Sequence, residues 1–517
     1  MIIPLSGRVD SNNASKSEED ILARLEAVGT ASVVLDAEKL EYISSAGLRM
    51  ILHLKKLYPA LRVVNVSPEV YEIFDMTGFT EMMPVEKAYR VVSVEGCEEI
   101  GRGANGTIYR IDQDTVVKVY NNADALDDIR HEREVAKLAL ILGIPTAISY
   151  DVVRVGESYG SVFELLNARS FSSILADQPE KLDWCVAEYV KMLKLIHATL
   201  VPPGKLPDMK EIALYWVDSA QPVFPEKARE KLRSLICAVP HDDHMLHGDY
   251  HTKNLMLQDD EVLLIDMDTL CVGSPIFEFG NIYNAYRGFY ELDRDAIRAF
   301  QGISPETGEA FFERSLAAYL GTNCAAKLNE VRDKARILGY TRLISRSFRH
   351  KLDQTPQGRA EIEHWTRELL ELLERTDKLT FSPDELEIEA ATENLEEVQS
   401  FVGERLESAD CPLKTLMQIG VAVEEIFVNI ASYAYAPEKG NALVRVEVST
   451  APVTVSITFI DHGIPYDPLS RTDPDTSLPA EERGIGGLGI FMTKKLMDDI
   501  AYEYRDGQNI LTMKKAL

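Results

Sequence analysis

Two short segments carry the side chains best suited to chemistry, HGDYHTKN at 247–254 and IDMD at 265–268. The first supplies Asp249 and Asn254, and the second supplies Asp266. Carboxylate and amide oxygens are the ligands that Mg²⁺ prefers, and a bound metal ion offsets the charge on a transferred phosphoryl group. These residue types therefore suit a Mg²⁺ site.

A glycine-rich turn precedes them, with Gly101, Gly103 and Gly106 between two strand patterns. This spacing alone is a weak signal, because it also marks simple hairpin turns. Lys118 follows in the strand pattern VVKVY, and Glu134 lies on the next helix pattern. This order is the one that a lysine and glutamate pair orienting ATP phosphates requires.

A second group of polar residues lies near the C-terminal end. Glu425 and Asn429 are spaced i, i+4, so they share one face of a helix. Asp461 and Gly463 follow a strand pattern, although an Asp-x-Gly sequence alone is a common turn. Backbone amides at the start of a glycine-rich helix can hold phosphate oxygens. Four glycines open such a helix: Gly484, Gly486, Gly487 and Gly489.

A pair of serines, Ser44 and Ser45, stands between a strand end and an amphipathic helix in EYISSAGLRMILHL at 41–54. Either hydroxyl group could accept a phosphoryl group. The structural alternative is that one serine only caps the helix, a contribution of about 1 kcal/mol.

The elements that position these residues fall into three predicted domains, at residues 1–90, 91–375 and 379–517. The length of 517 residues fits about three domains of roughly 150 residues. Strand and helix patterns alternate in the first, which favours an α/β sandwich. The second begins with strands and continues as helices, and the third is another α/β unit. The predicted fold class is thus a multidomain chain of α/β and α+β type.

Composition limits the partners and the location. The net charge of −28 argues against direct binding of nucleic acid or an anionic membrane, because both normally require Lys and Arg to neutralise phosphates. No apolar run approaches the roughly 20 residues of a membrane span, and the N-terminus lacks a signal pattern. The six cysteines show no paired spacing, so reduced thiols in the cytoplasm are expected.

The middle segments resemble the aminoglycoside phosphotransferase and choline kinase family, built on the bilobal protein-kinase fold, over about residues 95–350. The resemblance implies that Asp249 is the catalytic base and that Asn254 and Asp266 bind Mg²⁺. GSPIFEFG at 273–280 departs from the family pattern at a segment expected to anchor the catalytic loop. The family phosphorylates varied small hydroxyl compounds. The implied ATP-binding residues are Gly101, Gly103, Gly106, Lys118 and Glu134.

The C-terminal segments resemble the anti-sigma-factor serine kinases of the GHKL ATPase superfamily, which have the Bergerat-type α/β sandwich. The resemblance implies that Asn429 coordinates Mg²⁺ and that Glu425 is the general base for an attacking serine. Asp461 would bind the adenine amino group, with Gly463 close to the base, and 465–483 would form a lid. The four glycines at 484–489 would hold the phosphates, and such kinases commonly form homodimers.

The first 90 residues resemble STAS domains of the anti-sigma-factor antagonist type, through VVLDAEKLEYISSAGLRMIL at 33–52 and SPEVYEIFDMTGF at 67–79. In that family a serine at the start of this helix is phosphorylated by a partner kinase. The resemblance favours Ser45 over Ser44 as the phosphoacceptor. The added charge of about −1.5 to −2 suits a helix N-terminus and can disrupt a packed interface.

The leading hypothesis is an ATP-dependent partner-switching regulator, in which the C-terminal domain phosphorylates a serine of a STAS domain with Mg-ATP. Its partners would be STAS-domain or sigma-factor-type regulatory proteins. One alternative is a small-molecule hydroxyl phosphotransferase with regulatory flanking domains, and another is an ATP-binding scaffold. Retention of Asp249 and Glu425 favours enzymes over a scaffold, because binding alone does not require both proposed bases.

Overall fold

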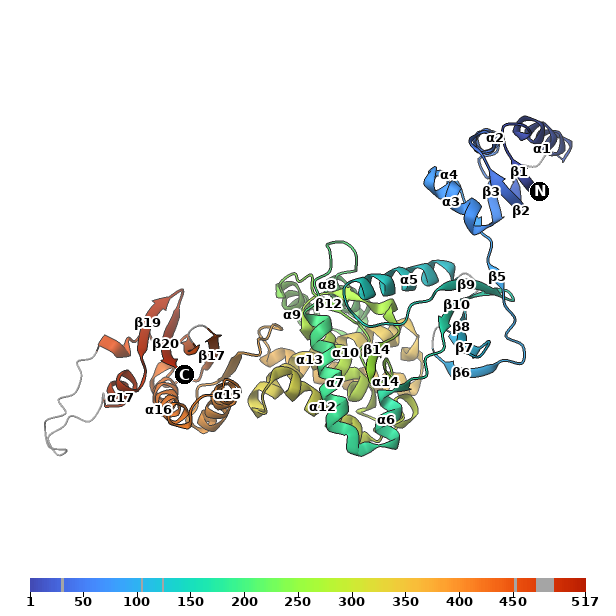
Figure 1. Cartoon of the computed structure of the whole chain (residues 1–517). Coiled ribbons are helices and arrows are strands. Elements are labelled where there is room, and N and C mark those ends of the chain that lie inside the picture. The colour runs from blue at the N-terminus through green and yellow to red at the C-terminus, as the bar shows by residue number, and fades with distance from the viewer. Residues whose placement is uncertain (29–31, 104–105, 123–124, 451–452, 471–487) are drawn as a thin grey trace, which may run out of the picture. The chain divides into compact units, whose positions relative to one another are not determined.

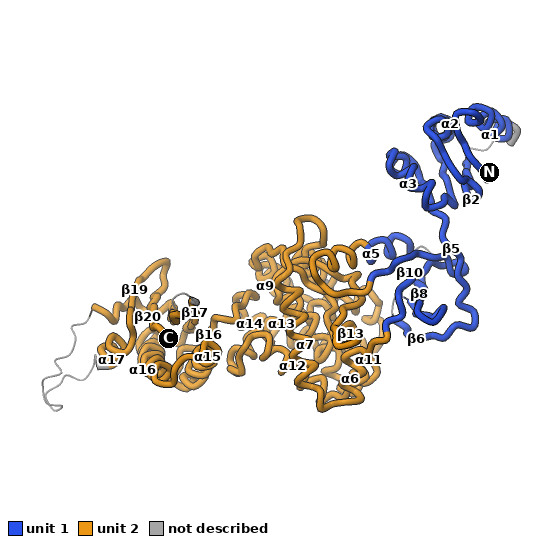
Figure 2. The backbone as a smooth tube through the Cα atoms, in the orientation of Figure 1, with its two compact units in different colours: residues 1–133, 148–166 blue, residues 134–147, 167–517 orange. Residues whose placement is uncertain are grey.

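A computed structural model of the chain describes residues 1–517 except 29–31, 104–105, 123–124, 451–452 and 471–487 (Figure 1). The contacts within the described chain divide it into two compact units (Figure 2). The first unit comprises residues 1–133 and 148–166, and the second comprises 134–147 and 167–517.

The first unit begins with a parallel sheet in the order β1-β2-β3-β4. Burial alternates along β1, as expected for a strand with one face in the core. Helix α2 buries Leu48, Ile51 and Leu54 at helical spacing against this core. The elements are β1 (Ile2–Val9), α1 (Ala14–Val28), β2 (Val34–Ile43), α2 (Ser45–Leu57), β3 (Arg62–Val66), α3 (Pro68–Met76), α4 (Phe79–Met82) and β4 (Val85–Lys87).

A second sheet of the first unit has six strands in the order β5-β9-β10-β8-β7-β6. Its neighbours are antiparallel except for β5 and β9. Val117, Val153 and Val162 form its buried core. The elements are β5 (Arg90–Val91), β6 (Glu98–Arg102), β7 (Gly106–Arg110), β8 (Thr115–Tyr120), α5 (Leu126–Ile141, which continues into the second unit), β9 (Asp151–Val155) and β10 (Ser158–Glu164).

The second unit starts with a mainly helical region around one large core, which includes Tyr189, Phe277 and Phe311. Two pairs of short strands, β12 with β15 and β13 with β14, flank the polar segments at 247–254 and 265–270. The strands are β11 (Arg169–Ser170), β12 (Met245–Leu246), β13 (Leu255–Gln258), β14 (Glu261–Leu264) and β15 (Cys271–Val272). The helices are α6 (Phe171–Asp177), α7 (Leu182–His197), α8 (Met209–Ser219), α9 (Glu226–Ala238), α10 (Pro275–Tyr286), α11 (Ala296–Gln301), α12 (Pro305–Leu320), α13 (Ala325–Arg349) and α14 (Pro356–Arg375).

The last region of this unit is an antiparallel sheet in the order β16-β17-β18-β20-β19, packed with helices around Phe401, Phe427 and Phe459. Its elements are β16 (Glu385–Glu389), α15 (Leu395–Ser408), α16 (Leu413–Asn429), β17 (Asn441–Thr450), β18 (Val453–Asp461), α17 (Leu488–Leu496), β19 (Asp499–Arg505) and β20 (Gln508–Ala516). Short helical turns of the chain are η1 (Pro179–Lys181), η2 (Gln221–Val223), η3 (Met267–Thr269), η4 (Gly288–Tyr290), η5 (Leu352–Gln354), η6 (Thr392–Asn394), η7 (Ile430–Ala434, a π-helical turn) and η8 (Pro468–Ser470).

The start of α13 is tied to α15. The Glu397 carboxylate accepts hydrogen bonds from the Cys324 thiol (3.1 Å) and the Ala326 amide (3.4 Å). Glu404 accepts from the Asn323 amide at 2.9 Å and from the Thr322 hydroxyl group. Because the first amides of a helix have no partner within it, these carboxylates act as caps from another element.

One described segment, Leu413–Ala434, is long and apolar enough to cross a membrane by length and composition. Its residues Ile419, Val423 and Phe427 are buried in the core of the last region. The core helix of a soluble protein passes the same test, so the segment is weak evidence for a membrane span.

Candidate functional site

The segment after β12 brings together the three chemical residues predicted near it. The side-chain amide of Asn254 donates to the Asp249 carbonyl oxygen at 3.1 Å. The Ile265 amide donates to the Asn254 carbonyl oxygen at 2.9 Å, which places Asp266 beside this loop. Asp266 itself has a left-handed backbone, with φ of 63°. Aspartate adopts this conformation more readily than most residues with a Cβ, and here Asp266 precedes the short turn η3.

Asp249 lies between two basic side chains. His251 Nε2 is 3.5 Å from one carboxylate oxygen, and Arg342 Nη2 is 3.5 Å from the other. Burial raises the pKa of Asp249, but the hydrogen bond with His251 and the charge of Arg342 outweigh burial and hold the pKa well below its usual range. Asp249 is therefore ionised near neutral pH, the form that can accept a proton.

Glu278 anchors the loop that carries Asp249, a role that sequence analysis did not assign to this residue. Its buried carboxylate accepts hydrogen bonds from the His247 amide (2.5 Å) and the Gly248 amide (3.2 Å). Burial raises the pKa of Glu278 to about 7, although both hydrogen bonds oppose that shift. The side-chain amide of Asn281 adds a bond to the Gly248 carbonyl oxygen at 2.9 Å. The departure noted at 273–280 therefore supplies the anchor.

In the first unit, the glycine-rich segment forms the hairpin of β6 and β7. The Gly103 amide donates to the Gly106 carbonyl oxygen at 2.9 Å. A Cβ atom at Gly106 would overlap the Val119 carbonyl oxygen, so the close approach of the strands requires glycine there. Gly101 lies in β6, and residues 104–105 of the turn are outside the described chain.

The carboxylate paired with Lys118 is that of Glu132. Lys118 Nζ lies 2.9 and 3.1 Å from the two Glu132 oxygens, and the Tyr120 hydroxyl group donates to the same carboxylate at 2.5 Å. The predicted partner, Glu134, is exposed. Residues two apart on a helix point in different directions, so only one of these glutamates can face β8. The assignment of Glu134 to this pair was wrong.

In the last region, Glu425 and Asn429 are in direct contact on α16. The Asn429 side-chain amide donates to a Glu425 carboxylate oxygen at 2.6 Å and to the Glu425 carbonyl oxygen at 2.7 Å. A Cβ atom at Gly489 would overlap the Glu425 carboxylate. The start of α17 therefore lies directly against the proposed base. Gly484, Gly486 and Gly487 lie outside the described residues, as do residues 471–483 of the predicted lid.

Asp461 ends β18 as a buried carboxylate. One of its oxygens accepts from the Asn509 side-chain amide at 2.8 Å and from the Gly463 amide at 2.9 Å. Asn509 is held in turn by the Tyr502 hydroxyl group at 2.7 Å. Sequence analysis missed Asn509, which fixes the carboxylate predicted to recognise adenine. A Cβ atom at Gly463 would overlap the Ala434 carbonyl oxygen, so glycine is required at this turn.

The two serines before α2 have different environments. Ser44 is the N-cap residue, and its hydroxyl oxygen accepts from the Ala46 amide at 3.2 Å. Ser45 is the first residue of the helix and is exposed. A Cβ atom at Gly47 would overlap atoms of Val9 and Ile43, so glycine lets this helix start close to the sheet. The capping role thus belongs to Ser44, which leaves Ser45 open to a partner.

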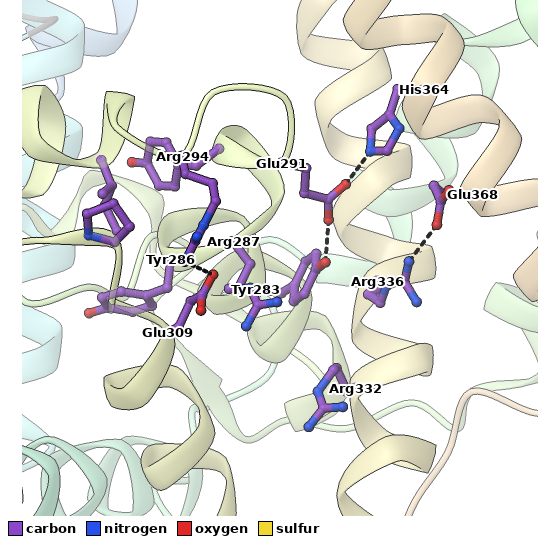
Figure 3. Close-up of a pocket in the computed structure, with 13 residues that line it drawn as sticks. Tyr283, Tyr286, Arg287, Glu291, Arg294, Glu309, Arg332, Arg336, His364 and Glu368 are labelled. Atoms are coloured by element: carbon purple, nitrogen blue, oxygen red, sulfur yellow. Dashed lines mark hydrogen bonds and ion pairs between the residues drawn. The ribbon is translucent and has the colours of Figure 1, made fainter. Parts of the chain in front are cut away.

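The second unit also contains a polar cavity of about 440 Å³ (Figure 3). In Figure 3, Glu291 lies between Tyr283 and His364, and Arg336 points toward Glu368. None of the residues predicted for the site lines it. The lining residues are Tyr283, Tyr286, Arg287, Tyr290, Glu291, Arg294, Ile297, Pro305, Glu309, Arg332, Arg336, His364 and Glu368.

Oxygen donors suited to Mg²⁺ occur in two regions of the second unit. Asn254 and Asp266 in one region and Asn429 beside Glu425 in the other offer the oxygen donors that Mg²⁺ takes in phosphate-bound sites, so the residues fit that ion. Within the described residues, no group of three His, Cys, Asp or Glu side chains forms a metal cluster.

Three family models match successive parts of the chain. The STAS domain matches residues 1–92, the phosphotransferase enzyme family matches 96–318, and the histidine kinase-like ATPase domain matches 388–515.

Curated relatives match the two ends. BtrV of Bordetella bronchiseptica, which bears the name anti-sigma factor antagonist, is 38% identical over 89 residues, covering 16% of this chain and 76% of BtrV. The serine/threonine-protein kinase BtrW of the same organism is 28% identical over 93 residues, 18% of this chain and 65% of BtrW. The serine-protein kinase RsbW of Listeria monocytogenes is 27% identical over 105 residues, 20% of this chain and 66% of RsbW. The chain thus spans slightly less than two thirds of these kinases.

Among solved structures, the chain is similar to the ADP-bound aminoglycoside phosphotransferase APH(2'')-Ib, with 12% identity, a TM-score of 0.40 and coverage of 58% of this chain and 98% of that one. A choline/ethanolamine kinase family protein from Mesorhizobium loti has 13% identity, a TM-score of 0.36 and coverage of 54% and 88%. The sequence relationships above show that the chain belongs to the STAS family of anti-sigma-factor antagonists through its N-terminal region, fused to a phosphotransferase-family domain and a histidine kinase-like ATPase domain.

Proposed function

We propose that this protein is an ATP-dependent partner-switching regulator whose C-terminal ATPase domain phosphorylates Ser45 of a STAS domain. The observation that carries the proposal is the contact of Glu425 with Asn429 on α16, together with the close approach of Gly489, at the start of α17, to the Glu425 carboxylate. This arrangement puts a carboxylate beside a candidate Mg²⁺ ligand and beside a helix N-terminus, which is suited to phosphate oxygens. Similarity to BtrW and RsbW, which are named serine kinases, supports the same reaction.

In the proposed step the Ser45 hydroxyl oxygen attacks the γ-phosphorus of ATP, and the bond to the bridging oxygen breaks to release ADP. Glu425 accepts the hydroxyl proton. A bound Mg²⁺ would neutralise charge on the phosphates, with Asn429 as its ligand. Asp461, oriented by Asn509, would hold the adenine amino group.

Ser45 is the acceptor because its hydroxyl group is exposed at the first turn of α2, whereas Ser44 already caps the helix. A phosphate group there would gain from the helix N-terminus and add about two negative charges to the surface of the domain. That change would alter binding to a STAS-type or sigma-factor-type partner. We also expect a homodimer, on the sequence resemblance, and a cytoplasmic location, on the lack of paired spacing among the six cysteines.

The middle domain is proposed as a second phosphotransferase, acting on a small hydroxyl compound. The assembled Asp249, Asn254 and Asp266 favour it, because a mere scaffold would not need an ionised carboxylate held beside metal-binding oxygens. Lys118, oriented by Glu132, would bind the ATP phosphates together with the glycine-rich hairpin. Small-molecule phosphorylation as the main activity is the alternative function that this observation supports.

The test is incubation of the full chain with labelled Mg-ATP, followed by mapping of phosphate by mass spectrometry. The compared proteins are the wild type and the Glu425→Ala, Asp249→Asn and Ser45→Ala variants. Phosphate on Ser45 that is lost in Glu425→Ala and kept in Asp249→Asn supports the proposal. Loss only in Asp249→Asn would assign the reaction to the middle domain instead.

Mixing two of these variants separates transfer within one chain from transfer between chains. The Glu425→Ala chain keeps Ser45 but lacks the base, and the Ser45→Ala chain keeps the base but lacks the acceptor. Phosphate on Ser45 in the mixture can arise only between chains. If the wild type is phosphorylated and the mixture is not, transfer occurs within one chain.

A further inference from the structure

The proposed catalytic base of the middle domain contacts the first of three arginines on α13. Arg342 lies 3.5 Å from the Asp249 carboxylate, and its guanidinium group lies 5.8 Å from the centre of the buried Trp216 ring. Arg346 and Arg349 follow at i+4 and i+7, so the three share one face of the helix. The base thus contacts one end of a basic helix face, in a chain whose net charge is −28.

Arg346 is part of the same positive region. Its guanidinium group lies 5.3 Å from the centre of the Phe289 ring. Burial and the like charges of Arg342 and Arg349 lower the pKa of Arg346, while Glu361 on α14 opposes that shift. The cations therefore repel one another, and a negative group placed among them would relieve that repulsion.

We infer that the acceptor of the middle domain is an anionic hydroxyl compound, bearing a carboxylate or phosphate group that Arg342 and Arg346 bind. This inference rests on the proposed phosphotransferase activity of that domain. The planar guanidinium group suits both anions, because its N–H donors match their paired oxygens. A cationic acceptor would instead be repelled by the like charges of Arg342 and Arg346.

The same contact suggests how the acceptor prepares the base. In the structure Arg342 is paired with Asp249. When the acceptor's anionic group takes Arg342 as its partner, Asp249 turns to the acceptor's hydroxyl group. That hydroxyl oxygen then attacks the γ-phosphorus of ATP, the bond to the bridging oxygen breaks, ADP leaves and Asp249 receives the proton.

The experiment uses the full-length Glu425→Ala chain, so that the C-terminal kinase is silent. ADP release is measured with acceptors matched in size and different in charge: choline, glycerol, glycerate and glycerol 3-phosphate, then glucosamine, glucose, gluconate and glucose 6-phosphate. Binding of each acceptor in the presence of ADP and Mg²⁺ is measured by calorimetry. We expect an anionic member to exceed its neutral and cationic counterparts at least about tenfold, in kcat/KM or in affinity, the ratio that about 1.4 kcal/mol produces. Comparison of glycerate with glycerol 3-phosphate, and of gluconate with glucose 6-phosphate, shows whether the site prefers a carboxylate or a phosphate group.

Arg346→Gln should reduce that preference about tenfold and leave kcat/KM for neutral acceptors within about threefold, since one Coulomb interaction is removed. Arg342→Lys keeps the charge and should retain the preference for anions. Arg359, exposed on α14, provides the control variant Arg359→Gln, which should change neither quantity.

Three results would overturn the inference. Asp249-dependent turnover that favours neutral or cationic acceptors would support the phosphotransferase activity of the middle domain and contradict only the inferred negative charge of the acceptor. An equal loss for all acceptors in Arg346→Gln would assign the arginines to ATP. The third result is that no acceptor is turned over and none binds in a charge-dependent way, while Ser45 is still phosphorylated in the chain with Glu425 intact. It would contradict both the phosphotransferase activity of the middle domain and the inferred charge of its acceptor.

Discussion

The Asn429 side-chain amide donates to the Glu425 carboxylate at 2.6 Å, one turn earlier on α16. The pair joins a proposed metal ligand and a proposed base on one helix face. If the side-chain oxygen of Asn429 binds a metal ion, the side-chain NH₂ group of Asn429 stays directed at Glu425, so this residue can bind the metal ion and the carboxylate at the same time.

Glu425→Gln should reduce Ser45 phosphorylation at least about 10²-fold, because a positioned base typically contributes that much or more. Glutamine keeps the shape and can still contact Asn429, so ATP affinity should change little. Quantitative mass spectrometry of Ser45 and a nucleotide-binding isotherm check both statements. Undiminished phosphorylation in this variant would remove Glu425 from the mechanism.

Ser44→Ala and Ser45→Ala should have opposite effects. Loss of the Ser44 cap should destabilise the STAS region by about 1 kcal/mol while phosphorylation persists. Ser45→Ala should abolish phosphorylation with little change in stability, since its side chain is exposed. Denaturant unfolding and phosphate mapping of both variants test this contrast, and phosphate found on Ser44 would reverse the assignment.

Glu132→Gln should lower ATP-dependent turnover by the middle domain about tenfold or more, because Lys118 would lose its charged partner. Glu134→Gln is the matched control, two residues later on the same helix and exposed, and should behave like the wild type. ADP release from the Glu425→Ala chain supplies the measurement. Equal effects in both variants would contradict the pairing seen here.

Glu278 should make stability depend on pH. Its pKa is raised to about 7 in the folded chain from an ordinary value of 4.5, so the folded state binds the proton more tightly. The contribution is present below about pH 4.5 and is lost as pH rises through about 7, by up to about 3 kcal/mol at 1.36 kcal/mol per pKa unit.

The Glu278→Gln variant cannot ionise at this position. The melting temperature of the wild type should therefore fall relative to this variant between about pH 4.5 and pH 7, and the difference should be constant outside that window. A difference that does not vary with pH would show that Glu278 keeps one protonation state throughout.

Asn509→Ala should raise the KM for ATP in Ser45 phosphorylation about tenfold with little change in kcat, because it frees the carboxylate of Asp461. Substitution of the half-buried Gln508 beside the same strand end is less suitable as a control, since Gln508 contacts His462. Lys514→Ala, further along β20, is the better matched variant. A fall in kcat alone would place Asn509 in the chemical step.

The sequence predicted the family of each region and the local motifs, because those residues lie close together in the chain. The choice between Glu132 and Glu134 could not be made in this way, because two glutamates on one helix differ only in the direction each faces. Asn509 lies 48 residues after Asp461 and is brought to it only by the pairing of β18 with β20. Glu278 was noted only as a departure from the family pattern, because its hydrogen bonds are to buried backbone amides, which leave no signal in the sequence.

The contacts of α13 with α15 bear on how this protein can be dissected. Cys324 belongs to the buried cluster of the ATPase region, although it precedes by some fifty residues the linker between the predicted middle domain, which ends at 375, and the predicted ATPase domain, which begins at 379. A fragment cut at the linker would expose apolar surface and leave the Glu397 and Glu404 carboxylates without their donors. Expression of the ATPase as a separate module therefore requires either polar substitutions on the newly exposed face of α15 or inclusion of α13, the helix that covers this face in the intact chain.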